Sequence, residues 1–438
     1  MEYLKKEIKQ GVTLHLINNK NFKTDFTVFF LSLPLEKETI TKNALLPAVL
    51  RSGCKKYQSY QKIIEELEML YGAAFDCGVD KTGDNLVLKF FIESINDNYL
   101  PNKNNNLEKV INVLTEIIFN PQVQNDSFDE TKVELEKRNL EMIINAQKDN
   151  KDFYAYDKCV KAMYKNQSYG LSKYGDTKDL QAINNKNLYE QYKQVIDTCK
   201  IDIIVSSDFQ AEEIAKIIKK NELIQTIKPR EEKIKINDIK KEIKDIIEKP
   251  EEIKEELDVT QGKLVIGLDI LPNRFDDFRY ITIVYNAIFG NGVSSKLFQI
   301  VREKESLAYT TKSEYVVQKN NIFIRCGIEC DKYQKTLDLI KKLLDDMKKG
   351  DFTDEEITKA KEYILAGVDS ISEEQDSQIL FLFGQELSKR SITIDEYKEK
   401  IKNVTRDEII EIANKVQINT IYFLRNGGEN ADNWKFKS

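Results

Sequence analysis

In its 438 residues the chain has a single histidine, His15. This scarcity excludes zinc motifs that place two histidines on one turn of a helix. A Ser-His-Asp or Cys-His catalytic device would have to use His15, yet no Gly-x-Ser-x-Gly motif accompanies it. His15 alternates with Leu14 and Leu16 in a strand-like segment. We therefore interpret His15 as a side chain on the face of a sheet.

Other features are scarce as well. The 17 glycines and 7 prolines are too few for a collagen-like or low-complexity protein. There is no run of about 18 apolar residues and no apolar signal-peptide core, so we expect neither a membrane-spanning helix nor a membrane partner. The net charge of −6 argues against a nucleic-acid partner. Six scattered cysteines predict reduced thiols in the cytoplasm.

The chain has enough apolar residues to form packed cores, since 41% of its residues are hydrophobic. The helix and strand signals also repeat once in the same order. Each half has an amphipathic helix, a long helix that opens after a phenylalanine, and a late helix that leads into a short apolar strand. The paired helices begin at Leu107 and Leu337, at Phe128 and Phe352, and at Leu188 and Ile409, and the strands after the last pair begin at Ile201 and Thr420. This repetition predicts two copies of one α+β unit.

We place the first unit at residues 1–228 and the second at residues 259–438. Residues 229–258 between them are rich in lysine and glutamate, with isoleucine at about every third position. We interpret this segment as a charged, solvated linker that docks some helix or strand through its isoleucines.

Each unit begins with strands. In the first unit, Gly11 to Asn18 and Phe26 to Leu35 are separated by a turn-rich stretch and are predicted to form a hairpin. In the second unit, Gly262 to Asp269 and Asn321 to Cys330 are the clearest strands. Strands and helices cluster rather than alternate, so we predict a mostly antiparallel sheet with helices packed on one face.

A glycine turn in the second unit is a further candidate for a site. Gly290, Asn291 and Gly292 suit a turn that another backbone approaches closely, and they lack the lysine spacing of a nucleotide-binding loop. Arg302 and Tyr309 follow, seven residues apart. Residues at this spacing share one face of a helix, so a guanidinium and a phenol would project together. Such a donor pair can bind a carbonyl oxygen as it becomes an oxyanion. Taken by itself, an Arg/Tyr pair at this spacing is common and usually structural.

The stretch from the glycine turn to Tyr309 resembles the C-terminal-domain signature of the insulinase/pitrilysin (M16) family of zinc peptidases. The residues that carry the resemblance are Gly290-Asn291-Gly292-Val293-Ser294-Ser295-Lys296-Leu297-Phe298, Val301-Arg302-Glu303 and Leu307-Ala308-Tyr309. The duplication, the length and the α+β pattern agree with that family. The resemblance therefore covers nearly the whole chain.

The same resemblance implies that the zinc site of the family is missing. Its inverted motif, His-x-x-Glu-His, precedes a glycine and a small residue that match Gly53 and Cys54, which places the motif at Ala44, Pro47 and Ala48. None of these side chains can hold zinc or act as a base. The further carboxylate ligand would lie on the helix of Glu134 and Glu136, which we expect to be exposed. The chain should therefore bind no catalytic metal.

The chain lacks the zinc motif but has the Arg/Tyr pair. In this combination it resembles the non-catalytic subunit of the two-subunit peptidases of the family. The resemblance implies a heterodimer in which a zinc-bearing paralogue supplies zinc, water and base. Arg302 and Tyr309 would bind the scissile carbonyl of a peptide or protein substrate in trans, and the turn at Gly290, Asn291 and Gly292 would lie near that substrate. A homodimer stays open.

Two further functions stay open. The chain could be an assembly scaffold or a peptide-binding protein with no part in catalysis, or an independent enzyme that uses a cysteine such as Cys54. The segments Leu70-Tyr71-Gly72-Ala73-Ala74 and Gln261-Gly262-Lys263-Leu264 resemble one bacterial branch of the family. That branch is associated with 5-aminopentanol modification of elongation factor P, and its members are cytoplasmic and non-catalytic.

Overall fold

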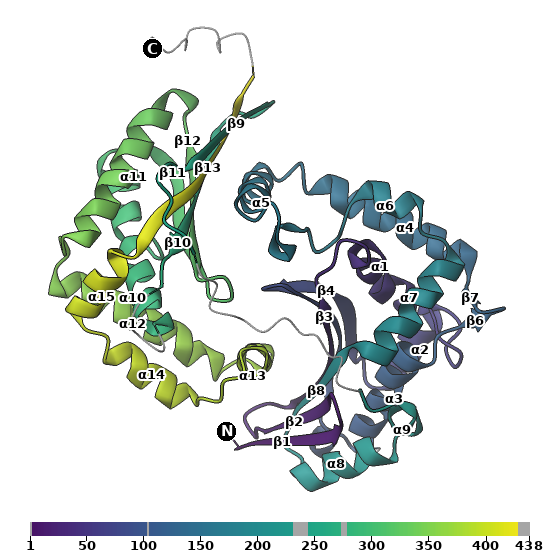
Figure 1. Ribbon diagram of the computed structural model, residues 1–438. Coiled ribbons are helices and arrows are strands. Elements are labelled where there is room, and N and C mark those ends of the chain that lie inside the picture. The colour runs from purple at the N-terminus through teal and green to yellow at the C-terminus, as the bar shows by residue number, and fades with distance from the viewer. Residues whose placement is uncertain (1, 103–104, 231–243, 273–277, 428–438) are drawn as a thin grey trace. The chain divides into compact units, whose positions relative to one another are not determined.

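The computed structural model describes residues 2–102, 105–230, 244–272 and 278–427 (Figure 1). Two compact units divide the chain. The first contains Met1–Asn145, Leu171–Asp238 and Glu374–Gly384, and the second contains Ala146–Gly170, Ile239–Glu373 and Gln385–Ser438. Each unit therefore includes a segment from the opposite half of the sequence.

The sheet of the first unit has six strands in the order β1-β2-β8-β3-β5-β4. All neighbouring pairs are antiparallel except β2 with β8, which is parallel. The strands are β1 (Glu2–Lys9), β2 (Val12–Asn18), β3 (Thr24–Pro34), β4 (Ala74–Thr82), β5 (Asn85–Ile95) and β8 (Lys200–Ser207), and a separate two-stranded sheet pairs β6 (Val123–Gln124) with β7 (Ser127–Phe128).

Helices cover one face of this sheet. Helix α3 shows why, because Leu107, Val110, Leu114 and Ile117 recur at helical spacing and all four are buried against the sheet. The helices are α1 (Ile40–Arg51), α2 (Tyr60–Met69), α3 (Asn106–Phe119), α4 (Glu130–Ala146), α6 (Thr177–Gln181), α7 (Asn185–Thr198), α8 (Ala211–Lys220) and α9 (Glu222–Thr226), with a short 3₁₀ turn η1 (Asp97–Tyr99).

The second unit repeats this arrangement. Its five-stranded sheet has the order β11-β12-β10-β13-β9, again antiparallel except for one parallel pair, β13 with β9. The strands are β9 (Glu251–Leu257), β10 (Gly262–Ile270), β11 (Ala308–Val316), β12 (Asn321–Ile328) and β13 (Val416–Asn426). The helical segments on one face are α10 (Arg279–Phe289), η3 (Leu297–Lys304), η4 (Cys330–Lys332), α11 (Tyr333–Lys348), α12 (Asp354–Ile371), α14 (Ile394–Lys402) and α15 (Arg406–Ala413).

One helix from the other half of the sequence packs on the opposite face of each sheet. In the first unit this is α13 (Gln375–Leu387), where the ring of Phe383 stacks on Phe30 of β3 at 3.9 Å between centroids. In the second unit it is α5 (Lys151–Met163), which is followed by η2 (Ser168–Gly170) and packs with Val265 and Phe323 in a separate apolar cluster. Both faces of each sheet are therefore used for packing.

The predicted fold class is confirmed, but the predicted hairpin is wrong. Strands β2 and β3 do not pair with each other, because β8 lies between them and pairs with both. The apolar residues of β2 and β3 are the same in either arrangement, so the local pattern could not reveal the strand inserted from residues 200–207. The strand predicted to reach Cys330 ends at Ile328.

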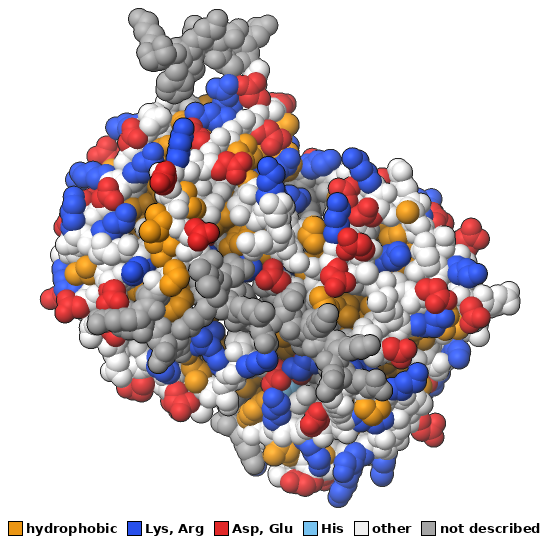
Figure 2. Space-filling model, in the orientation of Figure 1, with side chains coloured by type: hydrophobic (Ala, Val, Ile, Leu, Met, Phe, Trp, Pro, Cys, Tyr) orange, Lys and Arg blue, Asp and Glu red, His pale blue; other side chains and the backbone are white. Residues whose placement is uncertain are grey.

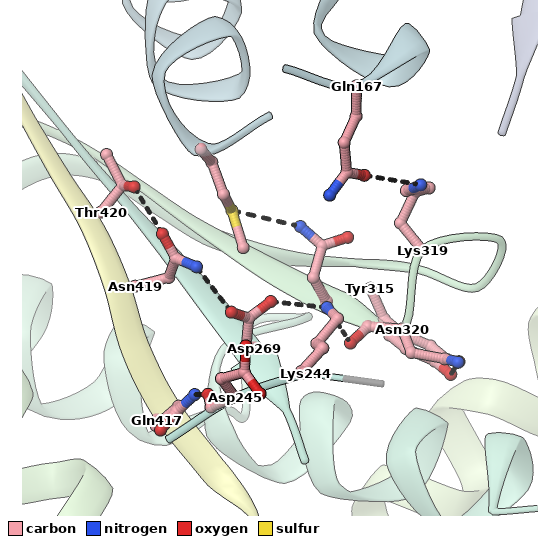
Figure 3. Close-up of polar contacts among 12 residues, drawn as sticks. Gln167, Lys244, Asp245, Asp269, Tyr315, Lys319, Asn320, Gln417, Asn419 and Thr420 are labelled. Atoms are coloured by element: carbon pink, nitrogen blue, oxygen red, sulfur yellow. Dashed lines mark hydrogen bonds and ion pairs between the residues drawn. The ribbon is translucent and has the colours of Figure 1, made fainter. Parts of the chain in front are cut away.

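The segment between the halves contributes a strand to the second sheet. Its residues 231–243 lie outside the described part of the chain, whereas Glu251–Leu257 form the edge strand β9 of the second sheet. Close to the start of the described stretch, Lys244 Nζ contacts Asp269 Oδ1 of β10 at 2.5 Å (Figure 3). Both side chains are only 7% exposed, and Asn419 Nδ2 donates to the second oxygen of Asp269 at 2.6 Å. A buried ion pair therefore anchors the segment.

The side chain of Gln417 strengthens this anchor. Its amide nitrogen donates to the carbonyl oxygen of Asp245 at 2.7 Å, and its amide oxygen accepts from the backbone N–H of Ile247 at 3.1 Å. The side-chain amide thus donates to one backbone carbonyl and accepts from one backbone N–H, as the backbone of a neighbouring strand would. The residues just before β9 are thus fixed to the end of the second sheet.

A buried carboxyl in the first sheet should make stability depend on pH. Asp25 of β3 is fully buried, and Asn96 Nδ2 and Ser207 Oγ both donate to its Oδ1 at 2.6 Å. Burial raises the pKa of Asp25 to about 6 from 3.8, and the negative charges of Asp208 and Asp97 act in the same direction. Between these values the folded chain holds a proton that the unfolded chain has released.

Stability should therefore fall as the pH rises from about 4 to about 6, by up to roughly 1.4 kcal/mol for each pH unit. Asp25→Asn removes the titrating group, so the free energy of unfolding of this variant should not show the decrease that Asp25 causes between pH 4 and 6. The check is the denaturant midpoint of both proteins between pH 4 and 7. Parallel curves for the two proteins would show that Asp25 does not titrate in this range.

Candidate functional site

The glycine turn follows helix α10, which ends at Phe289. The backbone N–H of Ser313 in β11 donates to the carbonyl oxygen of Gly290 at 2.8 Å. A Cβ on Gly290 would lie 2.4 Å from Leu297 Cδ1 and 2.5 Å from Ser313 Oγ, so only glycine allows this approach. Gly292 needs to be glycine for another reason, because its φ is +111°. Asn291 lies between them and completes the turn.

Arg302 lies in the last turn of the π-helical segment η3. Leu297 and Val301 of this segment are buried in the core, which fixes the segment against the second sheet. A bond from Glu305 N–H to the carbonyl oxygen of Ile300 spans five residues, as in a π-helix. Short π-helical segments occur frequently at functional sites.

The structure separates Arg302 and Tyr309 into two elements. Ser306 has a left-handed φ of +49°, which ends the helical segment, and β11 then begins at Ala308. The prediction that both side chains share one helix face is therefore wrong. Arg302 comes from the end of η3 and Tyr309 from the start of β11, and one tight turn joins these elements.

The Arg302 side chain is 43% exposed. Its guanidinium lies 4.6 Å from the centre of the Phe298 ring, one helical turn earlier, and its Nε lies 3.5 Å from Glu303 Oε1. Ion pairs this exposed contribute little to stability. The ring contact and the carboxylate therefore orient the guanidinium, and much of it stays open to solvent.

Tyr309 occupies a bulge in β11. Ala308 pairs with Ile328 and Thr310 pairs with Gly327, so Tyr309 is an extra residue without a partner on β12. A bulge changes the direction of side chains near it. Tyr309 is 58% exposed, and its hydroxyl donates to Glu329 Oε1 at 2.7 Å.

This hydrogen bond and the negative charge of Glu329 raise the pKa of the Tyr309 phenol. Conversely, hydrogen bonds from Tyr309 and Lys332 lower the pKa of the Glu329 carboxyl. At neutral pH the phenol is therefore a neutral donor and Glu329 is an anion. Nothing in the sequence pattern pointed to Glu329, because its contact with Tyr309 depends on the pairing of β11 with β12.

Helix α1 carries the three positions at which the resemblance places the zinc motif. The side chains of Ala44, Pro47 and Ala48 offer no ligand atom, and the carbonyl oxygen of Pro47 accepts a hydrogen bond from Cys77 Sγ at 3.3 Å. Burial raises the pKa of the Cys77 thiol to about 12, so it stays protonated. Within the described ranges no group of three or more His, Cys, Asp or Glu side chains could hold a metal ion. The residues at this site do not fit zinc.

The two carboxylates on helix α4 differ from each other. Glu134 is exposed and pairs with Lys137 at 2.8 Å, as expected. Glu136, in contrast, is only 8% exposed, and Asn139 Nδ2 donates to its Oε2 at 3.0 Å. The prediction of an exposed Glu136 is wrong, because this side of α4 faces the packed interior.

His15 and Cys54 have structural roles. His15 is 1% exposed, and its two ring nitrogens contact Tyr3 Oη at 2.8 Å and Asp202 Oδ1 at 3.1 Å. Cys54 is fully buried beside Tyr57, and burial raises the pKa of its thiol. A protonated, inaccessible thiol is not a nucleophile.

Comparison with known proteins shows the family of this chain. Residues 182–364 match the family described as Peptidase M16 inactive domain. The chain is 32% identical over 415 residues to "Probable inactive metalloprotease YmfF" of Bacillus subtilis (strain 168), covering 95% of this chain and 96% of that protein. The chain belongs to the M16 peptidase family.

Other M16 relatives extend the comparison. "Uncharacterized zinc protease YmxG", also from Bacillus subtilis (strain 168), is 24% identical over 317 residues, covering 71% of this chain and 70% of that protein. The crystal structure of a conserved protein from Enterococcus faecalis V583 superposes with a TM-score of 0.89 at 26% identity. It covers 98% of this chain and all of that chain.

The family assignment confirms the resemblance read from the glycine turn to Tyr309, and the chain is an inactive M16 homologue. In the described part of the chain, no helix has the length and apolar character needed to cross a membrane. On the face drawn in Figure 2, lysine and arginine side chains are interspersed with acidic ones.

Proposed function

We propose that this M16 homologue is the non-catalytic subunit of a two-subunit zinc peptidase. A zinc-bearing paralogue hydrolyses the peptide bond, and Arg302 and Tyr309 act on the same substrate in trans. The observation that carries the proposal is the pairing of two features in one chain. Helix α1 has no zinc ligands at Ala44, Pro47 and Ala48, yet an exposed guanidinium and an exposed phenol are kept on either side of one turn.

The chemistry of the pair suits this role. As a peptide carbonyl is attacked, its oxygen gains negative charge, and fixed donors stabilise that charge more than they stabilise the ground state. Arg302 supplies a permanently charged donor, and Tyr309 supplies a neutral one. The turn at Gly290, Asn291 and Gly292 precedes the helical segment of Arg302, and we propose that it lies along the substrate.

The relatives support a partner. Bacillus subtilis has both a relative named as inactive and a relative named as a zinc protease. A cell with both kinds of M16 chain has the parts of a heterodimer. We place the complex in the cytoplasm, where the six cysteines, all free in the structure, would stay reduced.

An assembly scaffold or peptide-binding protein without catalytic contribution is the second candidate. It is favoured by the contacts that both donors already make, Arg302 with Glu303 and Tyr309 with Glu329. Either function could serve the modification of elongation factor P, to which the resembling bacterial branch is linked.

Purification from the native cell tests the proposal. A tagged copy of this chain should bring along an M16 chain of similar size in a 1:1 ratio, and the pair should hold one zinc ion per heterodimer. The isolated chain should hold none. Stoichiometric zinc in the isolated chain, together with unaided proteolysis, would contradict the proposal.

A further inference from the structure

The hydroxyl proton of Tyr309 is already engaged. It is donated to Glu329 Oε1 at 2.7 Å. A phenol has one O–H, so while this bond is made Tyr309 can accept a hydrogen bond from another group but cannot donate one. An oxyanion needs a donor. Glu329 and a substrate oxyanion would therefore compete for the same proton.

Glu329 is itself held in place. It follows the last residue of β12, and Lys332 Nζ lies 3.1 Å from its second oxygen, Oε2. The same ammonium donates to the carbonyl oxygen of Ser306 at 3.4 Å. Ser306 is the left-handed residue between η3 and β11. One short network thus fixes Glu329 and the turn that joins the segments of Arg302 and Tyr309.

The bulge explains why Tyr309 is available for this contact. A residue in the regular ladder would have a Cα partner on β12, whereas the register shift between Ala308 and Thr310 leaves Tyr309 without one. Tyr309 and Thr310 are both exposed. The phenol is therefore open to solvent and lies next to the carboxylate of Glu329.

We propose that Glu329 is a positioning residue for Tyr309, which holds the phenol in one orientation between reaction cycles and releases its hydrogen bond when the oxyanion forms. This inference rests on the proposed function. The step exchanges one acceptor for another, so no covalent bond forms or breaks and the proton stays on the Tyr309 oxygen. An ionised acceptor binds a donor more strongly than a neutral one. Breaking the hydrogen bond to the Glu329 carboxylate therefore costs part of the free energy by which Tyr309 stabilises the oxyanion.

Kinetics of the assembled complex test this role. Glu329→Gln keeps an oxygen acceptor but removes the charge, and it should raise kcat about threefold with KM unchanged, because only the transition state competes for the proton. Tyr309→Phe should slow turnover. The double variant should turn over at the rate of Tyr309→Phe, since Glu329 acts through the phenol.

The outcomes separate this inference from the proposed function. If Tyr309→Phe leaves turnover unchanged, the proposed function fails. If Tyr309→Phe slows turnover while Glu329→Gln leaves it unchanged or slows it, the role of Glu329 is overturned. A rise in kcat that persists in the Tyr309→Phe background would overturn it too, because the effect would then bypass the phenol.

A second measurement uses the full chain alone. The ring-carbon NMR signal of Tyr309 can be assigned by its loss in Tyr309→Phe and then followed against pH. Besides Glu329, the charged groups that act on this phenol are Lys332, which lowers its pKa, and Asp331, which raises it. Glu329→Gln should lower the pKa of Tyr309, and an unchanged titration would contradict the contact on which the inference depends.

Discussion

Replacing Arg302 with alanine is expected to slow peptide cleavage by the assembled complex about 10²- to 10³-fold, the usual cost of removing one oxyanion donor. The loss should fall on kcat, because the guanidinium is proposed to bind charge that develops only in the transition state. Arg302→Lys should recover part of the rate, since lysine keeps the charge but lacks the planar donor fork.

Stability gives the matching control. Arg302 is partly exposed, and its contacts are a weak ion pair with Glu303 and a ring contact with Phe298, so its removal should change the free energy of unfolding by no more than about 0.5 kcal/mol. Lys304 ends the same helical segment and is also exposed, so Lys304→Ala tests whether any cation there matters. If Arg302→Ala lowers the melting temperature and leaves the rate unchanged, Arg302 is structural.

Asp269→Ala should have the largest effect on stability, about 3–5 kcal/mol. It leaves the Lys244 ammonium, whose side chain is 7% exposed, without its carboxylate partner. It also removes the acceptor of Asn419. Breaking one side of a buried ion pair costs more than replacing both sides, because the remaining charge stays desolvated.

The double variant Lys244→Met/Asp269→Leu should therefore recover most of the loss. Asp351→Ala is the control, because Asp351 is exposed. Denaturant midpoints measure the overall effect, and hydrogen exchange of the β13 amides measures it locally. Equal effects of Asp269→Ala and Asp351→Ala would mean that the ion pair does not hold the segment before β9.

The sequence predicted the parts of the fold that depend on local pattern. The apolar spacing of Leu107 to Ile117 and of Leu337 to Met347 gave helices α3 and α11, because helical periodicity is a property of neighbours in the chain. The insertion of β8 between β2 and β3 could not be predicted in this way. Strand order depends on pairing between residues almost 200 positions apart.

For the site, the sequence identified residues but not the local structure that positions them. The signature drew attention to Arg302 and Tyr309, but a left-handed Ser306 is not a pattern that residue spacing reveals, so the helix was extended too far. Glu329 was missed because its contact with Tyr309 depends on the bulge in β11. Glu136 was placed on the surface because the partners that bury α4 come from elsewhere in the chain.

We propose that this chain supplies hydrogen-bond donors to a reaction centre that it does not itself contain. The most direct measurement is the rate of peptide cleavage as the purified chain is titrated into the purified zinc-bearing paralogue. The rate should rise from near zero and saturate at one chain per paralogue, and the Arg302→Ala/Tyr309→Phe variant should bind equally well without raising it. A paralogue that cleaves at its full rate alone, or is activated equally by that variant, would contradict the claim.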